Sequence, residues 1–155
     1  MQLSHQKYFH QTTAYSNDRG SLGGGVFILV NNNIIATEQV QYIVKCEIEW
    51  IKIKLKDAKD LLIGAFYMPH KNIHDLNELQ KSLDTITMEN DKIIILAGDF
   101  NCPDIEWTNK TTKIHANDKE IQKSLIEITA QAGLTQIHEE TTREKNSWIW
   151  YIHQT

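Results

Sequence analysis

The hydrophobic residues of this chain gather in short runs that are typical of β-strands. Continuous apolar runs over 26–30, 61–67 and 92–97 indicate buried strands, and the last of them suits the centre of a sheet covered on both faces. Residues 47–56 alternate between polar and apolar, which predicts a half-buried strand whose charged side chains face water. These four segments predict that a β-sheet forms the centre of the fold.

Two longer segments repeat apolar residues every three or four positions, which predicts amphipathic helices over 75–88 and 118–132. The apolar stripes of these helices consist of Leu76, Leu79, Leu83 and Ile86 in the first, and Ile121, Leu125 and Ile128 in the second. Gly133 follows the second helix and is typical of a C-terminal cap. Shorter strand patterns lie at 34–36, 134–137 and 147–152. The order of elements predicts a mixed α/β (α+β) layered domain.

The polar N-terminal segment has no clear period. We therefore expect residues 1–18 to form a disordered or remnant arm and residues 19–155 to form the folded domain. Residues 102–116 read as a polar loop. A length of 155 residues is that of a single domain.

Composition excludes several classes of protein. The chain is 41% hydrophobic and 23% charged, with a net charge of -4, which argues against broad, charge-driven binding of nucleic acid. It has neither the apolar run of a membrane helix nor the apolar core of a signal peptide. Cys46 and Cys102 form no CxxC pair and are expected to be reduced thiols. We expect a nuclear or cytoplasmic protein that is not secreted and has no membrane partner.

The sharpest candidate site is the tetrapeptide Gly98–Asp99–Phe100–Asn101 after the apolar run at 92–97. In extended backbone, Asp99 and Asn101 point to one side and Phe100 points into the core. A carboxylate at the carboxyl end of a strand can hold a water or a hydrated Mg2+, and a carboxamide can donate hydrogen bonds to a phosphate. The alternative is a turn in which Asp99 and Asn101 cap backbone amides.

Other polar residues give weaker signals. Tyr67 ends an apolar run, where its hydroxyl can contact a phosphate or simply mark the rim of a sheet. His70 and His74 are four residues apart, but no zincin pattern accompanies them, which favours surface histidines. Thr142 and Arg143 can bind a phosphate through a hydroxyl and a guanidinium, or belong to a solvated turn.

Two further features favour packing over chemistry. The glycines at 23–25 precede a strand, whereas phosphate-binding glycine loops follow a strand and open a helix. The glycines therefore indicate close backbone packing. Core or edge packing, rather than stacking on nucleobases, is the interpretation for Trp50, Trp107, Trp148 and Trp150.

Taken in order, the motifs resemble one family. They are Gly-Gly-Gly-Val-Phe-Ile at 23–28, Glu-Trp-Ile-Lys-Ile at 49–53, Gly-Ala-Phe-Tyr-Met-Pro at 64–69, Ile-Ile-Leu-Ala-Gly-Asp-Phe-Asn-Cys-Pro-Asp-Ile-Glu-Trp at 94–107, Leu-Thr-Gln at 134–136 and Thr-Thr-Arg-Glu-Lys-Asn at 141–146. They are similar to those of the endonuclease/exonuclease/phosphatase superfamily. The resemblance is greatest to the endonuclease domain of non-LTR (LINE-type) retrotransposon polyproteins, and it extends over about residues 19–147.

The resemblance implies a four-layer α/β sandwich of the deoxyribonuclease I-like and apurinic endonuclease-like type, here partial. It also implies Mg2+-dependent hydrolysis of a DNA phosphodiester. Asp99 would orient or activate the attacking water, and Asn101 would support the transition-state phosphate. Tyr67 would be the aromatic residue at the neighbouring strand end, and Thr142, next to Arg143, a phosphate contact.

This sequence also departs from the family pattern. A strand-borne asparagine and a metal-binding glutamate normally precede the glycine triplet, and a Ser-Asp-His motif normally ends the domain; neither can be assigned here. No metal ligand is therefore assigned, and the chain is expected to be truncated at both ends. Whether it is an enzyme stays open, because losing one member of a catalytic unit costs orders of magnitude in rate.

Three functions follow. The first is a DNA endonuclease that is weak or inactive as this chain, and the second is a catalytically dead fragment that acts as a folded remnant or binding module. The third is a small-molecule phosphoesterase of the same superfamily. Missing strands would expose sheet edges, through which the chain would associate with partners.

Overall fold

The computed structural model describes residues 11–17, 25–56, 59–89, 92–137 and 148–153. Its elements, in chain order, are β1 (Thr12–Asn17), β2 (Val26–Asn31), β3 (Ala36–Glu38), the 3-10 turn η2 (Val40–Tyr42), β4 (Glu47–Ile53), β5 (Asp60–Tyr67), α1 (Ile73–Thr87), β6 (Lys92–Asp99), β7 (Ile105–Glu106), β8 (Thr111–Thr112), α2 (Lys119–Gln131), β9 (Thr135–Gln136) and β10 (Trp148–His153).

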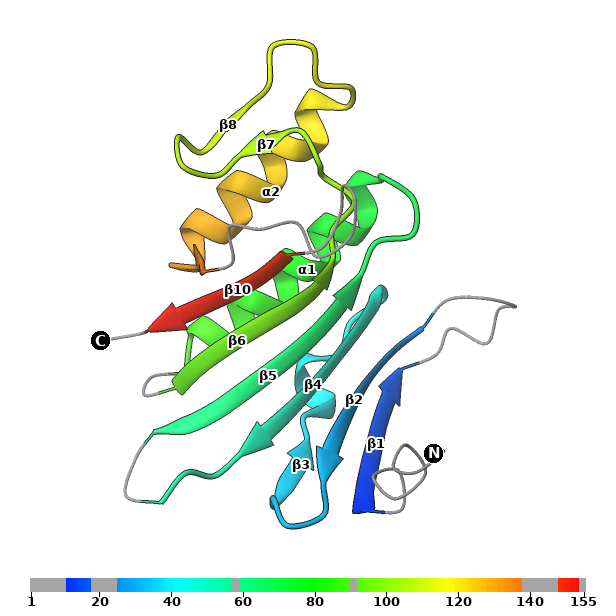
Figure 1. The fold of residues 1–155 in the computed structure, drawn as a ribbon, viewed down its shortest axis with the longest axis vertical. Coiled ribbons are helices and arrows are strands. Elements are labelled where there is room, and N and C mark those ends of the chain that lie inside the picture. Colours follow the sequence, from blue (N-terminus) through cyan, green and yellow to red (C-terminus); the bar gives the residue numbers. More distant parts are fainter. Residues whose placement is uncertain (1–10, 18–24, 57–58, 90–91, 138–147, 154–155) are drawn as a thin grey trace, which may run out of the picture.

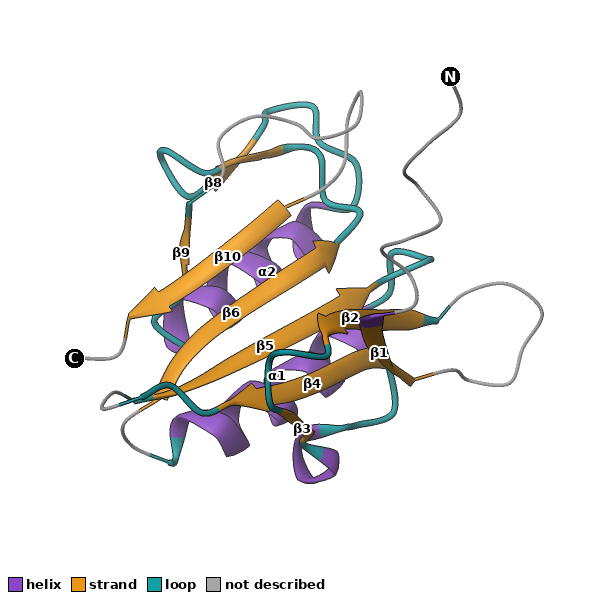
Figure 2. Cartoon of the chain, turned by 60° about the horizontal axis from the view of Figure 1, so that its bottom comes forward, coloured by secondary structure: helices purple, strands orange, loops and turns teal. Residues whose placement is uncertain are grey.

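The centre of the fold is a six-stranded sheet with the order β3-β4-β5-β6-β10-β9. Strands β5 and β6 are parallel and are joined through α1, whereas the other neighbours in this sheet are antiparallel. Both helices cover one face of the sheet, and the two-stranded β1–β2 ribbon lies on the opposite side next to β4 (Figures 1 and 2). The result is the α/β sandwich that the sequence predicts.

The helix side of the sheet carries the main hydrophobic core. The Trp50 indole lies against Gly64, where an added Cβ would come within 2.5 Å of the ring. Its Nε1 donates a hydrogen bond of 2.9 Å to Ser82 Oγ on α1, and Ser82 Oγ donates in turn to the Tyr42 carbonyl oxygen at 2.6 Å. The Trp50 indole nitrogen and the Ser82 hydroxyl are thus both paired, as burial requires.

The apolar stripe predicted for α1 is confirmed, because all four of its members are buried. The helix begins after Asn72, whose Oδ1 accepts a hydrogen bond of 2.8 Å from the Asp75 amide, and this cap supplies one of the free N-terminal amides with a partner. In α2, Leu125 and Ile128 are buried and Ile121 packs against the core. Gly133 has a φ of 67° after the helix, where a glycine is preferred.

Three expectations need correction. Thr12–Asn17 lies in the segment expected to be disordered but pairs with β2 along its whole length as β1. The loop at 102–116 contains the short β7–β8 hairpin. The charged face of β4 is not in water: Glu47 is 2% exposed and Glu49 is fully buried. The alternating pattern identified the strand but not the β1–β2 ribbon that covers its polar face.

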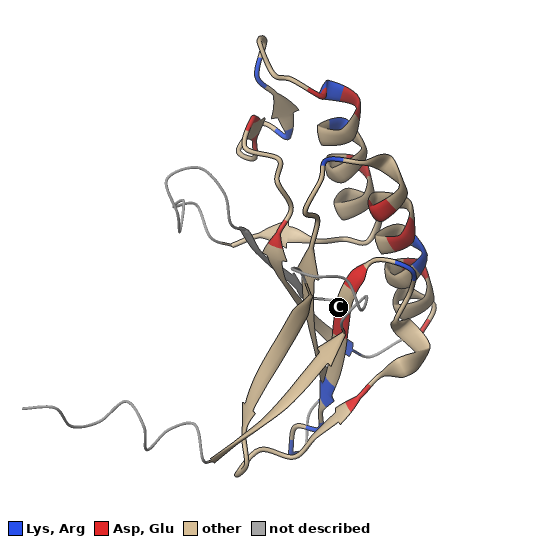
Figure 3. Cartoon of the chain, turned by 90° about the vertical axis from the view of Figure 1, so that its right-hand side faces the viewer, with Lys and Arg blue, Asp and Glu red and all other residues tan. Residues whose placement is uncertain are grey.

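The surface of the described part shows two further features. Lys, Arg, Asp and Glu lie on the helices and loops and also within the central sheet (Figure 3), where β4 carries Glu47, Glu49 and Lys52. Cys46 and Cys102 are both buried, and neither forms a disulfide within the described part of the chain. No helix among the described residues is long and apolar enough to cross a bilayer.

Candidate functional site

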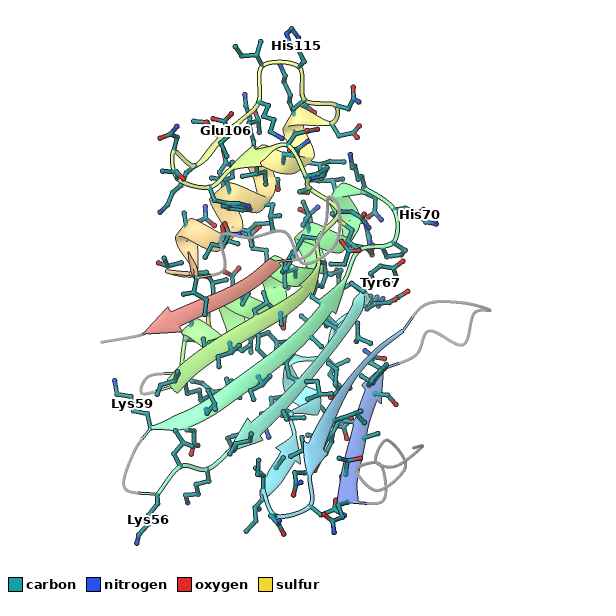
Figure 4. All side chains as sticks on the ribbon, viewed as in Figure 1. Lys56, Lys59, Tyr67, His70, Glu106 and His115 are labelled. Atoms are coloured by element: carbon teal, nitrogen blue, oxygen red, sulfur yellow. The ribbon has the colours of Figure 1, made fainter. Side chains whose placement is uncertain are left out.

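The register of the central sheet places three polar residues in one row across its strands. Glu47 of β4 is the partner of Tyr67 in β5, and Tyr67 is the partner of Asp99 in β6. Partners in register project to the same face of a sheet. This row lies at the end of the sheet where β5 and β6 finish, and Figure 4 shows Tyr67 there, far from Lys56 and Lys59 at the opposite end.

Gly98 makes the close pairing of β5 and β6 feasible at this end. A Cβ on Gly98 would lie 1.7 Å from the Phe66 carbonyl oxygen, so no other residue fits without moving the backbone. The next residue but one, Phe100, is fully buried, and its ring centroid lies 5.1 Å from that of Phe66. The prediction that Phe100 points into the core is confirmed.

The backbone leaves the strand immediately after Asp99. Asn101 has a φ of 50°, so the extended geometry that would place Asp99 and Asn101 side by side does not continue. Instead the Asn101 amide donates a hydrogen bond of 3.0 Å to Asp99 Oδ1, which is an Asx-type turn. Asp99 thus caps a backbone amide, as the alternative interpretation of the sequence predicts for this residue.

The Asn101 side chain joins the two strand ends. Its Nδ2 donates a hydrogen bond of 2.6 Å to the Met68 carbonyl oxygen, and the Met68 amide donates to the Asp99 carbonyl oxygen at 3.0 Å. Tyr67, Asp99 and Asn101 are all half-buried. The structure therefore brings the three predicted site residues together at one rim, accessible in part to solvent and held by backbone contacts.

His70, His74 and Cys102 differ from this half-buried group in exposure. His70 is exposed, and His74 Nδ1 lies 3.6 Å from Asp75 Oδ1 on α1. The pKa of the Cys102 thiol is raised to about 12, chiefly by burial, so this thiol is protonated and unreactive at neutral pH. Thr142 and Arg143 lie outside the described residues, as do Gly23 and Gly24 and the side chains of Trp148 and Trp150.

Sequence reasoning missed the two acidic residues of β4. The Gly25 amide donates a hydrogen bond of 2.7 Å to Glu47 Oε2, which joins the start of β2 to the row of polar residues. Glu49 Oε1 accepts from the Trp50 amide at 3.1 Å, whereas Glu49 Oε2 has no hydrogen-bond partner. Burial, together with the charge of Glu38, raises the pKa of Glu49. Alternation alone gives no signal that a second layer covers these carboxylates.

The described residues do not form a complete magnesium site. Among them there is no group of three or more His, Cys, Asp or Glu side chains arranged to hold a metal ion. Asp99 and Glu47 lie on strands separated by β5, and Glu47 Oε2 accepts a hydrogen bond from the Gly25 amide. Among the described residues, Asp99 is the carboxylate that accepts a hydrogen bond from the Asn101 amide.

Comparisons with known proteins agree with the fold. The chain is similar to the endonuclease domain of TRAS1, a telomere-specific non-LTR retrotransposon, with a TM-score of 0.63 and 14% identity over 91% of this chain and 67% of that one. It is also similar to the catalytic domain of human Nocturnin, with a TM-score of 0.59 and 13% identity over 92% of this chain and 61% of that one. No curated protein matches the chain.

The sequence itself also matches a family. Residues 61–150 match the profile of the endonuclease-reverse transcriptase family, and this segment contains α1, β6 and the whole Gly98–Asn101 motif. The match extends over more than half of the 155 residues. The chain therefore belongs to the endonuclease-reverse transcriptase family and has the fold of the endonuclease/exonuclease/phosphatase superfamily.

Proposed function

We propose that this chain is a DNA endonuclease domain of the non-LTR retrotransposon type, which hydrolyses a phosphodiester weakly when it acts alone. The observation that carries the proposal is the meeting of Tyr67, Asp99 and Asn101 at the ends of two parallel strands. That edge is where α/β sheets usually bind their ligands.

Each of these residues has a proposed role. The Asp99 carboxylate accepts a proton from, or orients, the attacking water, because it is an anionic group held at the motif's turn. The Asn101 carboxamide donates a hydrogen bond to a phosphate oxygen on which negative charge develops. Tyr67, in register with Asp99, contacts the same phosphate through its hydroxyl. Thr142 and Arg143 remain proposed phosphate contacts.

The contacts of the site explain why we expect only weak hydrolysis. The Asn101 Nδ2 hydrogen bond to Met68 must break before that amide can reach a phosphate, and Asp99 already caps the Asn101 amide. Magnesium remains the cofactor that the family resemblance implies. Because the described residues lack a complete site for it, we expect little hydrolysis without ligands from elsewhere.

The second candidate is a DNA-binding module without catalysis. The hydrogen bonds of Asp99 and Asn101 favour this candidate, because they give both side chains a structural role.

Partner chains would pair with the β1–β2 ribbon rather than with the central sheet. The edges of the central sheet are the short strands β3 and β9, and short edge strands limit association.

Nicking of supercoiled plasmid DNA in the presence of Mg2+ tests the proposal. The variant to compare is Asp99→Asn, because an asparagine oxygen still accepts the Asn101 hydrogen bond while the charge is lost. The matched control is Asp84→Asn on the exposed side of α1. We expect slow nicking by the wild type and the control, and a fall of at least tenfold in Asp99→Asn.

Two results would contradict the endonuclease. One is nicking that survives unchanged in Asp99→Asn. The other is the absence of nicking by the wild type, even at high protein concentration and with either Mg2+ or Mn2+. The second result, together with retained binding to DNA, would leave the binding module as the function.

A further inference from the structure

A second feature of the molecule is a cavity of about 420 Å³ between α2, the β7–β8 hairpin and β9. This volume falls within the range of about 300–1,000 Å³ that is typical of small-molecule sites. Glu47, Tyr67 and Asp99 do not line this cavity. The cavity therefore needs an explanation separate from the proposed catalytic rim.

The walls of the cavity are held by defined contacts. On one side is a tight turn in which the Lys110 amide donates a hydrogen bond of 3.2 Å to the Trp107 carbonyl oxygen. The base of this hairpin is closed by the Lys113 amide, which donates to the Asp104 carbonyl oxygen at 2.8 Å. On the other side, α2 presents Ile126, which packs against the hydrophobic core. The cavity is thus preformed, which lowers the entropic cost of binding.

The lining combines three kinds of side chain. Trp107, Ile126 and Leu134 form an aromatic and aliphatic wall, while Thr135 and Gln136 add groups that can form hydrogen bonds. Lys110 is the single charged residue in the lining, and it forms no ion pair within the described part of the chain. Such a lining is suited to a ligand that carries both a flat ring with polar edges and an anionic group.

The position of the cavity relates it to the rim. Trp107 follows Asn101 closely in the chain, and even a fully extended connection between them would span only about 20 Å. A DNA strand carries a phosphate about every 3.4 Å along the helix axis. A strand whose phosphate sits at Asp99 therefore places other nucleotides within reach of the hairpin, which lies above the ends of β5 and β6 in Figure 1.

We propose that this cavity binds one unstacked nucleobase of the DNA, next to Trp107, with Lys110 on an adjacent phosphate. The inference rests on the proposed function in so far as DNA is the substrate, but it does not require hydrolysis. An aromatic side chain supplies a stacking surface that accepts any base, and the lysine supplies a salt-sensitive contact with the backbone. The cavity would then grip the strand beside the reactive phosphate.

Fluorescence anisotropy with the full chain tests this, with EDTA present so that no hydrolysis occurs. The two probes are a labelled single-stranded oligonucleotide and its abasic counterpart, which has the same backbone but no bases. We expect the wild type to bind the probe with bases about tenfold more tightly, which is the size of one base–aromatic stack.

Five variants locate the effect. Ala130→Phe fills the cavity from α2 without removing a contact, and Trp107→Ala removes the aromatic wall; both should abolish the preference for bases while leaving the abasic affinity unchanged. Trp107→Phe keeps a ring and should restore most of the preference. Lys110→Ala should lower the affinity for both probes about threefold and should reduce the salt dependence of binding by about one phosphate contact. The control Lys123→Ala, on the exposed side of α2, should change neither the affinity nor its salt dependence.

The outcomes separate this proposal from the endonuclease. Equal binding of the two probes by the wild type, or a base preference that survives in Ala130→Phe, overturns the cavity proposal and leaves the nicking result untouched. A base preference in a chain that does not nick plasmid supports the cavity and contradicts the enzyme. Failure to bind either probe also overturns the cavity proposal, whereas the endonuclease is judged by plasmid nicking in Mg2+. Because Ala130 is exposed, thermal melting of Ala130→Phe should match that of the wild type even if Trp107→Ala unfolds.

Discussion

The two faces of the central sheet are built in opposite ways. On the helix side, Trp50 and its neighbours form a buried core, in which the indole nitrogen donates a hydrogen bond to Ser82. On the other side, the β1–β2 ribbon covers two carboxylates, Glu47 and Glu49, and one oxygen of Glu49 has no partner. Tyr67 and Asp99 continue that second face to the rim.

This difference places the main source of folding free energy on one face of the sheet and the candidate functional residues on the other. Burial of apolar surface on the helix side provides the free energy of folding, at roughly 25 cal/mol per Å² of area removed from water. Burial of carboxylates on the other side costs free energy, because a charged group loses its hydration. A face that retains such groups is where perturbed pKa values and functional residues are expected. Three substitutions test the contrast.

The largest effect is expected from Trp50→Ala on the helix side. Deleting the indole leaves a void between β4 and α1 and removes the Ser82 partner, so the free energy of unfolding should fall by about 3–5 kcal/mol. Urea denaturation followed by circular dichroism measures it. As a control, Ser82→Ala keeps the ring and should cost only about 1–2 kcal/mol. A loss below about 1 kcal/mol in Trp50→Ala would show that this face does not carry the core.

A smaller effect of opposite sign is expected from Glu49→Gln on the acidic face. The folded-state pKa of Glu49 is raised, so its favourable contribution is fully present below the unfolded pKa of about 4.5 and is lost as the pH rises through the folded-state pKa. Because a neutral amide costs less to bury than a carboxylate, the variant should be more stable by about 1 kcal/mol at neutral pH.

The pH dependence of this difference is the decisive measurement. The advantage of Glu49→Gln over the wild type should shrink as the pH falls towards about 4.5 and should be greatest at neutral pH. Glu38→Gln removes the charge that also raises this pKa, and should give a smaller gain of the same sign. A constant difference across the pH range would falsify the buried-carboxylate explanation.

The smallest effect is expected from Asp99→Asn at the rim. The asparagine oxygen can still accept from the Asn101 amide, so the free energy of unfolding should change by less than about 0.5 kcal/mol. Asp99→Ala removes the acceptor and should cost about 1 kcal/mol in the same denaturation measurement. If Asp99→Asn were as costly as Asp99→Ala, the carboxylate charge itself would be structural, which would favour the non-catalytic function.

Local pattern predicted most of the elements. The stripe from Leu76 to Ile86 found α1 because helical period depends only on neighbours in the chain, and the apolar run at 92–97 found β6 for the same reason. The Gly98–Asn101 motif was likewise located at a strand end from sequence. Thr12–Asn17 was missed as a strand, because this polar segment becomes β1 only by pairing with β2.

The sequence by itself determined both helices and the main strands of the central sheet, the buried position of Phe100 and the family to which the chain belongs. Only the tertiary structure decided that Glu47 and Glu49 are buried, that Asp99 caps Asn101, and that a cavity opens beside Trp107. The physical reason is the distance along the chain between the residues that interact. Periodicity records which face of one element is apolar, whereas burial of its polar face depends on a second layer from a distant part of the chain.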